Sequence, residues 1–199
     1  MEAFSSFVAD SNMSALLNSF FLVFAGEMGD KTQLLALLLA ARYRQPWVIL
    51  AGVFVATVLN HALASWAGGF LASYFSPVVL KWSLAILFFG FALWILIPDK
   101  EEEFKESGRF GAFFTTVVAF FFAEMGDKTQ LATVALGARF SQIWIVTIGT
   151  TMGMMASNAL AIFLGEKLLK RIPMKWVRVF ACGLFFLFGL GILLVGGEK

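Results

Sequence analysis

Cysteine and histidine are almost absent from this chain of 199 residues, which has one of each, Cys182 and His61. A single cysteine cannot form an internal disulfide, and in an apolar stretch it packs as a small hydrophobic side chain. Zinc and copper sites need several thiolate or imidazole ligands, so a site of that kind is excluded. The sequence also has no P-loop and no H-E-x-x-H pattern. We therefore expect neither an enzyme nor a resident cofactor.

Charged residues are also scarce, at 14 % of the sequence, whereas hydrophobic residues make up 60 % and the mean hydropathy is +0.84. A soluble domain of this length needs more polar surface, so the composition predicts an integral membrane protein with the lipid bilayer around it. The formal net charge is only +2, without a basic patch, and predicts no nucleic-acid partner.

Long apolar runs supply the predicted membrane spans, since about 20 apolar residues cross roughly 30 Å of hydrocarbon. The period-2 alternation of a membrane β-strand is absent, so these runs are expected to be helices. The predicted fold class is all-α, a polytopic membrane protein with six transmembrane helices. The predicted spans are 14–40, 47–72, 78–97, 110–137, 143–165 and 176–196.

The octapeptide EMGDKTQL occurs at 27–34 and again, letter for letter, at 124–131. At the same offset of 97 residues, NHALA (60–64) corresponds to SNALA (157–161). The costly polar residues match between the two halves while the apolar ones vary, which indicates that the duplication serves a function.

Two repeats follow from this offset: a first three-helix repeat (1–97) and a second three-helix repeat (110–199), joined by a charged cytoplasmic linker (98–109). Three crossings are an odd number, so the second repeat is expected to be inverted relative to the first. Inverted repeats are a recurrent plan of secondary transporters, whose substrate site lies at mid-membrane where the repeats meet.

Orientation is predicted from the basic residues, which gather on the cytoplasmic side of a membrane protein. Ten of the fifteen Lys and Arg residues fall in or beside the connections 42–44, 98–109 and 167–178. Only Lys81, Arg139 and Lys199 fall on the other side. We therefore expect both termini outside the cytoplasm.

The repeated motif places charged residues near the centre of spans one and four, where each charge costs from about 3 to more than 10 kcal/mol unless it meets a partner or water. Glu27 and Asp30 are spaced i, i+3 and would share one face of a continuous helix, and Lys31 follows Glu27 at i+4. The second copy repeats this spacing. Its acidic residues are Glu124 and Asp127, and its basic residue is Lys128.

The charges of the two motifs sum to −2, because four carboxylates face two ammonium groups. One divalent cation would neutralise such a site, and two protons could replace the cation because like charges held close together favour protonation. Oxygen ligands suit Mn²⁺, Ca²⁺ or Mg²⁺. A purely structural ion-pair network is disfavoured, since it would leave two aspartates without a counter-ion.

The other polar residues of the motif, and the asparagines of spans two and five, are candidates for supporting the site or lining the pathway. The glycine of each motif gives the backbone room to unwind and is a candidate hinge. For the asparagines, oxygen ligation and interhelical hydrogen bonding remain open. The supporting candidates are Lys31, Thr32, Gln33, Lys128, Thr129, Gln130, Asn60 and Asn158, and the hinges are Gly29 and Gly126.

Met28 and Met125 adjoin the acids, and a thioether ligand would favour Mn²⁺ over Ca²⁺. On a helix, however, neighbouring residues point about 100° apart, which favours packing for both methionines. For His61, interhelical hydrogen bonding is favoured over a role as a proton relay.

Two copies of E-x-G-D-K-[TS], one opening each half of a six-span chain near 200 residues, resemble the Gdt-like family of cation exchangers, which includes Golgi manganese/calcium transporters and bacterial manganese exporters. The resemblance covers essentially the whole chain. It implies export of Mn²⁺, or else Ca²⁺, from the cytosol in exchange for protons. It also implies that the cation is bound, transiently, by the acids of the two motifs, Glu27, Asp30, Glu124 and Asp127.

The compact chain resembles the bacterial branch of this family, which implies the bacterial inner (plasma) membrane. The alternative hypothesis is a small six-helix exporter of basic amino acids, although the resident lysines argue against a site that grips an ammonium group. A channel is disfavoured because four acids would hold an ion too firmly for fast conduction. The preference between Mn²⁺ and Ca²⁺, the proton stoichiometry and the oligomeric state, a homo-oligomer included, stay open.

Overall fold

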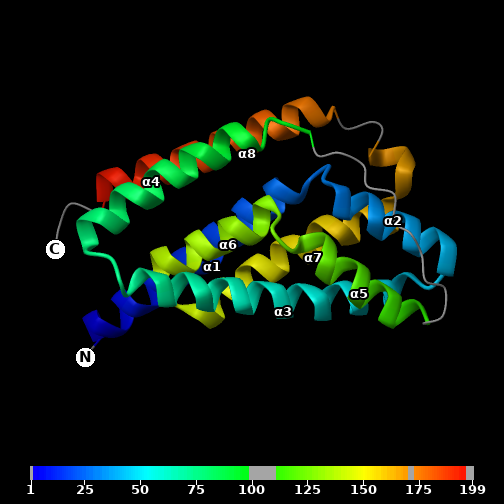
Figure 1. Cartoon of the computed structure of the whole chain (residues 1–199), viewed down its shortest axis with the longest axis horizontal. Helices are drawn as coiled ribbons and strands as arrows, with labels where there is room; N and C mark the ends of the chain where they lie inside the picture. Colours follow the sequence, from blue (N-terminus) through cyan, green and yellow to red (C-terminus); the bar gives the residue numbers. More distant parts are fainter. Residues whose placement is uncertain (1, 99–110, 170–172, 196–199) are drawn as a thin grey trace.

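The computed structural model describes residues 2–98, 111–169 and 173–195, and α-helix is the only regular secondary structure in these ranges (Figure 1). The predicted linker 98–109 lies outside the described residues except for Pro98. The helices are α1 (Glu2–Glu27), α2 (Lys31–Tyr43), α3 (Pro46–Ala72), α4 (Pro77–Trp94), α5 (Ala112–Glu124), α6 (Lys128–Phe140), α7 (Ile143–Leu169) and α8 (Met174–Val195).

The described residues thus form eight helices where the sequence predicts six. The difference arises at the two motifs, because the predicted spans 14–40 and 110–137 are each broken in the middle, into α1 and α2 and into α5 and α6. The other helices correspond to the remaining four predicted spans, with α7 interrupted near its end by a positive φ of 69° at Gly165.

The membrane class is confirmed by helix length and hydropathy. Among the described residues, four helices are individually long and apolar enough to cross a bilayer. Helix α5 is apolar but has 13 residues, which gives a length of about 20 Å, too short to cross alone. The four candidate spans are Pro46–Ala72, Pro77–Trp94, Ile143–Gly165 and Met174–Leu194.

Most of the packing joins elements from opposite halves of the sequence. Helix α1 packs mainly on α7, α3 packs on α5 and α6, and α4 packs along α8. In Figure 1 the start of α1 and the end of α8 lie at one end of the molecule, and α2 and α5 lie at the opposite end. Within the described ranges, each half therefore packs more extensively on the other half than on itself.

Close helix packing is permitted by small residues at equivalent positions in the two halves. A Cβ at Gly52 of α3 would lie 2.7 Å from the Cβ of Thr116 in α5, and a Cβ at Gly149 of α7 would lie 2.8 Å from that of Ser19 in α1. Glycine is needed at both positions because lipid supplies no hydrophobic drive between helices, so their association depends on close backbone approach.

Two buried hydrophobic clusters fill the molecule. The first joins α1, α4, α6 and α8 and contains the phenylalanines Phe88, Phe91 and Phe185. The second joins α2, α3 and α5 and contains Leu35, Val53 and other residues, with side chains of α7 packed against it. The α4–α8 pair contributes to the first cluster and not to the second, so it covers α1 and α6 and leaves α2 and α5 without this cover among the described residues.

Candidate cation site

The two motifs form the two helix breaks, and a glycine makes each break. Gly29 has a φ of +81° and Gly126 a φ of +78°, values that glycine adopts readily and other residues rarely. Helix α1 therefore ends at Glu27, and α5 ends at Glu124 in the same way. The predicted hinge positions are thus the points at which both helices are interrupted.

The glutamines of the motifs satisfy the backbone at the breaks. The side-chain oxygen of Gln33 accepts a hydrogen bond from the Gly29 N–H at 2.9 Å, and that of Gln130 accepts one from the Gly126 N–H at 2.7 Å. Backbone donors left unpaired inside a membrane are costly. These amide oxygens therefore stabilise the breaks, and the expected role of the glutamines in the pathway stays a prediction.

Each glutamate accepts a hydrogen bond from the threonine five residues later. The Thr32 hydroxyl donates to Glu27 Oε2 at 2.8 Å, and the Thr129 hydroxyl donates to Glu124 Oε2 at 3.3 Å. The glutamate side chains are fully buried. One oxygen of each carboxylate is thus oriented by its own motif.

The two breaks bring acids from both halves together. Glu27, Asp30 and Asp127 each have a carboxylate oxygen within 4.8 Å of the others, and all three residues are buried. Asp30 and Asp127 are the N-cap residues of α2 and α6, yet neither side chain makes a capping hydrogen bond. Their carboxylates are therefore directed to tertiary neighbours.

Glu124 is outside this group of three but belongs to the same electrostatic environment, because Glu27, Asp127 and Lys31 act on its charge. Its Oε1 and the Oδ2 of Asp127 are buried and make no hydrogen bond within the described residues. Buried carboxylate oxygens without donors are the type of ligand that divalent cations bind.

The sequence analysis was wrong about the local geometry of the motif. Glu27 and Asp30 do not share a face of one continuous helix, and Glu27 and Lys31 are not an i, i+4 pair within a helix, because the break separates them. The acids approach each other because the chain turns at Gly29, with the Asp30 N–H donating to the Glu27 carbonyl at 3.1 Å.

Lys128 has a partner that the sequence did not indicate. Its ammonium group donates to the carbonyl oxygen of Ile97 at 3.0 Å and lies 5.8 Å from the centre of the Trp94 ring. Because a buried ammonium group needs acceptors, this contact ties the second break to the end of α4. Lys31, the equivalent residue of the first motif, is half-buried and acts on the charge of Glu124.

The polar residues of α3 and α7 hydrogen-bond with neighbouring backbone. Asn60 donates to the Phe121 carbonyl at 3.0 Å, and Asn158 donates to the Met154 carbonyl of its own helix at 3.1 Å. Ser157 accepts a hydrogen bond from Gln33 at 2.9 Å. The asparagines thus join helices or brace one helix, although the Asn158 Oδ1 makes no hydrogen bond within the described residues.

The two methionines and the histidine differ in their burial and their contacts. The Met28 sulfur accepts a weak hydrogen bond from Gln33 at 3.5 Å, and Met125 is 55 % exposed. His61 is fully buried, and neither ring nitrogen makes a hydrogen bond within the described residues. The interhelical hydrogen bond expected for His61 is therefore absent from these residues.

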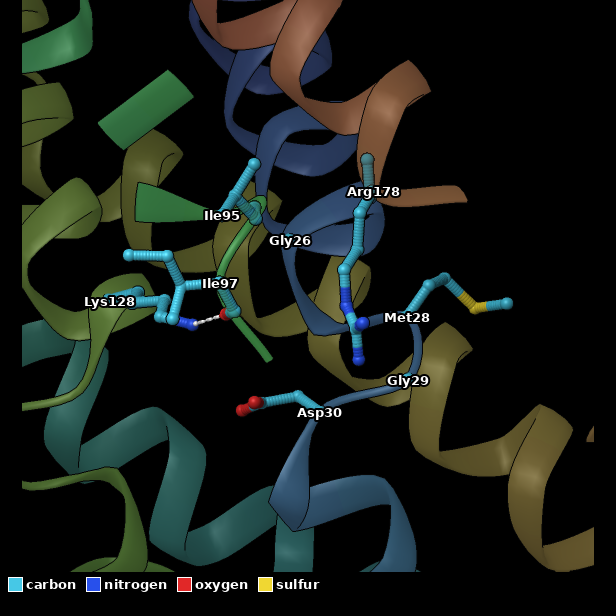
Figure 2. A pocket seen from close by; sticks show the side chains of 9 residues that line it. Gly26, Met28, Gly29, Asp30, Ile95, Ile97, Lys128 and Arg178 are labelled. Carbon is cyan, nitrogen blue, oxygen red and sulfur yellow. Dashed lines mark hydrogen bonds between the residues drawn. The ribbon is translucent and has the colours of Figure 1, made fainter. Parts of the chain in front are cut away.

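A small pocket lies beside the first break and has Asp30 in its lining (Figure 2). Ile95 and Ile97 at the end of α4, Lys128, and Arg178 of α8 also line it, together with the other residues around the break, which are Ala25, Gly26, Met28 and Gly29. Figure 2 shows the Arg178 side chain extending from α8 toward the backbone around Gly29 and Asp30. Arg178 was predicted only as a cytoplasmic charge, although its position inside the predicted span 176–196 was a signal.

The broken helices and the buried carboxylates at their junction define a class of protein, a helical membrane protein with a buried group of acids of the type that divalent cations bind. The sequence profile of the family described as "Divalent cation/proton antiporter GDT1" matches residues 15–103 and 112–199. The chain therefore belongs to the GDT1 family of divalent cation/proton antiporters. This match does not support the alternative of an exporter of basic amino acids.

Individual relatives agree with this assignment. A Vibrio cholerae protein named for manganese export is 46 % identical over 180 residues, which cover 89 % of this chain and 90 % of that protein. The Arabidopsis thaliana GDT1-like protein 5 is 30 % identical over 92 % of this chain and 97 % of its own length, and the Synechocystis GDT1-like protein sll0615 is 26 % identical over 89 % and 96 %. No solved structure matches the chain significantly.

Proposed function

We propose that this protein exports Mn²⁺ from the cytosol in exchange for protons, and that Glu27, Asp30, Glu124 and Asp127 bind the metal ion and the protons in turn. The observation that carries the proposal is the convergence of Glu27, Asp30 and Asp127, three buried acids from two motifs 97 residues apart, within 4.8 Å. The proposed exchange needs no resident cofactor, because the metal ion is the cargo.

Charge balance supports the exchange. The four acids and the two motif lysines sum to −2, so one divalent cation leaves the site neutral, and so do two protons. A low-dielectric interior strongly disfavours an uncompensated charge. The empty, fully ionised site is therefore the least favourable state, which couples release of the metal to uptake of protons.

Two inverted three-helix repeats, 1–97 and 110–199, account for the proposed alternating access. Apart from the first helix of each half, each helix of the second half begins 97 residues after its equivalent in the first half. For example, α2 begins at Lys31 and α6 begins at Lys128. Thr57 of α3 also hydrogen-bonds the sulfur of its equivalent, Met154 of α7, at 3.0 Å. Contact between equivalent residues is expected on an axis that relates two repeats.

The choice of Mn²⁺ over Ca²⁺ is supported by the 46 % identical relative named for manganese export. The carboxylates alone suit either ion. Orientation follows from the basic connections, so we place both termini outside the cytoplasm of a bacterial inner membrane.

Transport by purified protein in liposomes with an internal pH-sensitive dye tests the proposal. Mn²⁺ should drive proton movement with the wild type, and lysine should not. Glu27→Gln combined with Glu124→Gln should abolish this movement, whereas Glu101→Gln on the predicted linker, which removes one carboxylate from the charged loop, should not. Proton movement that persists in the double variant would refute the assigned site, and a response to Ca²⁺ alone would refute the assigned cargo.

A further inference from the structure

We propose that Arg178 of α8 is a positioning residue of the cation site, a fixed positive charge that weakens cation binding and so promotes release through the pocket of Figure 2. This inference rests on the proposed function and adds a residue from outside both motifs to it.

The first observation is the place of Arg178 in the pocket. Asp30, one of the three clustered acids, lines the same pocket, and so does Lys128. Figure 2 shows the guanidinium group directed from α8 toward the backbone around Gly29 and Asp30. A cation bound at Asp30 would therefore lie beside a pocket that carries two positively charged side chains.

The second observation is that the start of α8 packs against the first break. A Cβ at Gly29 would lie 2.7 Å from the sulfur of Met174, which is one helical turn before Arg178. A Cβ at the equivalent Gly126 would have no neighbour within 4 Å. Among the described residues, the start of α8 thus packs against the break at Gly29 and not against the break at Gly126. This packing places Arg178, one turn later in α8, beside the first break.

The chemistry of arginine suits a fixed charge better than a proton carrier. A guanidinium group stays protonated under all physiological conditions. Arg178 is not one of the six motif charges, which sum to −2, and it adds one positive charge at the pocket beside Asp30. Because the repulsion between two charges scales with their product, this residue weakens the binding of a divalent ion more than that of any monovalent competitor at the same place.

Removing this charge should therefore tighten binding and slow release. For Arg178→Gln we expect the KM for Mn²⁺ to fall about tenfold or more, with a fall in kcat because product release becomes slower. Arg178→Lys keeps the charge and should restore both values toward those of the wild type. A merely structural role would lower kcat without tightening the binding of Mn²⁺.

The experiment measures initial rates of Mn²⁺-driven proton movement in liposomes over a range of Mn²⁺ concentrations, with Mn²⁺ binding to the purified proteins by calorimetry alongside. The matched control is Lys81→Gln, which removes a cation from the equivalent position on α4, away from the pocket, and should leave KM and kcat unchanged. If Arg178→Gln does not fold, as judged by size-exclusion chromatography, Arg178→Met replaces it under the same criterion.

A KM and a binding constant for Mn²⁺ that stay at the wild-type values, or that weaken, would overturn the role of Arg178. That result is distinct from failure of the proposed function, in which the wild type itself shows no Mn²⁺-driven proton movement.

Discussion

At the scale of single residues, neighbouring polar residues of the motif make different contacts. The acids carry the charge of the site, the threonines donate hydrogen bonds to the glutamates, and the glutamines satisfy the backbone of the glycines. A polar residue at the centre of a membrane protein therefore need not touch the cation to be required for the site.

Loss of the Thr32 hydroxyl should weaken cation binding. Thr32→Val removes the donor to Glu27 Oε2, which is 2.8 Å away, and so removes one of the contacts that orient the carboxylate. A hydrogen bond to a charged group contributes about 1.5–3 kcal/mol, so the KM for Mn²⁺ should rise by about tenfold or more.

Thr133→Val is the matched control for this prediction, because the buried Thr133 hydroxyl donates only to the Thr129 carbonyl of its own helix at 2.8 Å. Liposome transport assays give the KM of both variants. Equal KM values for the two would show that the Thr32 hydroxyl does not orient Glu27.

At the scale of the elements, the helix breaks are the feature that creates the site. Each break ends one helix at a glutamate and begins the next after an aspartate, so the ends of four helices meet near the acids. Helix termini leave backbone groups without intrahelical partners. Broken helices are tolerated in membranes only where the freed groups find other partners, and the two glutamine side chains provide them here.

The two glycines should respond differently to the same substitution. Alanine at a positive φ costs about 1–2 kcal/mol at either position. At Gly29 the new methyl group would also meet the Met174 sulfur at 2.7 Å, whereas at Gly126 it would meet nothing within 4 Å.

Gly29→Ala should therefore lower the thermal unfolding temperature of the purified protein in detergent more than Gly126→Ala does. Gly111→Ala serves as the control, since Gly111 has a negative φ of −61° and no neighbour within 4 Å. An equal loss of stability at both breaks would mean that the contact with α8 is not present in the protein in detergent.

At the scale of the whole molecule, the position of the α4–α8 pair differs with respect to the two halves. Its equivalent residues Phe88 and Phe185 contact each other at a centroid distance of 6.2 Å, so the pair is symmetric within itself. It nevertheless packs on α1 and α6 and not on α2 and α5 among the described residues, as Figure 1 shows. We therefore expect that the proposed alternating access involves displacement of this pair.

Paired cysteines in a Cys182→Ala background would detect this displacement. A Cβ at Gly26 would lie 3.4 Å from Ile95 at the end of α4, so cysteines at 26 and 95 should be linked by a short bifunctional thiol reagent. The equivalent pair in the second half is 123 and 192. These two positions would come together if the α4–α8 pair moved from α1 and α6 onto α2 and α5.

If the α4–α8 pair moves as we expect, both cysteine pairs should be linked in liposomes, and each link should block Mn²⁺-driven proton movement until it is reduced. Single-cysteine variants serve as controls for modification alone. A 123–192 pair that never forms a link, in a protein that transports at the normal rate, would contradict this movement.

The sequence by itself determined the membrane class, the duplicated motif and the family, because an apolar composition and charged residues repeated at a fixed offset do not depend on knowing the path of the chain. Only the tertiary structure decided that the motif helices are broken, that Gln33 and Gln130 bond to the backbone, and that Met174 and Arg178 reach the first break. A positive φ at glycine and a contact between α8 and α1 depend on how distant segments pack, and no local pattern of residues encodes that packing.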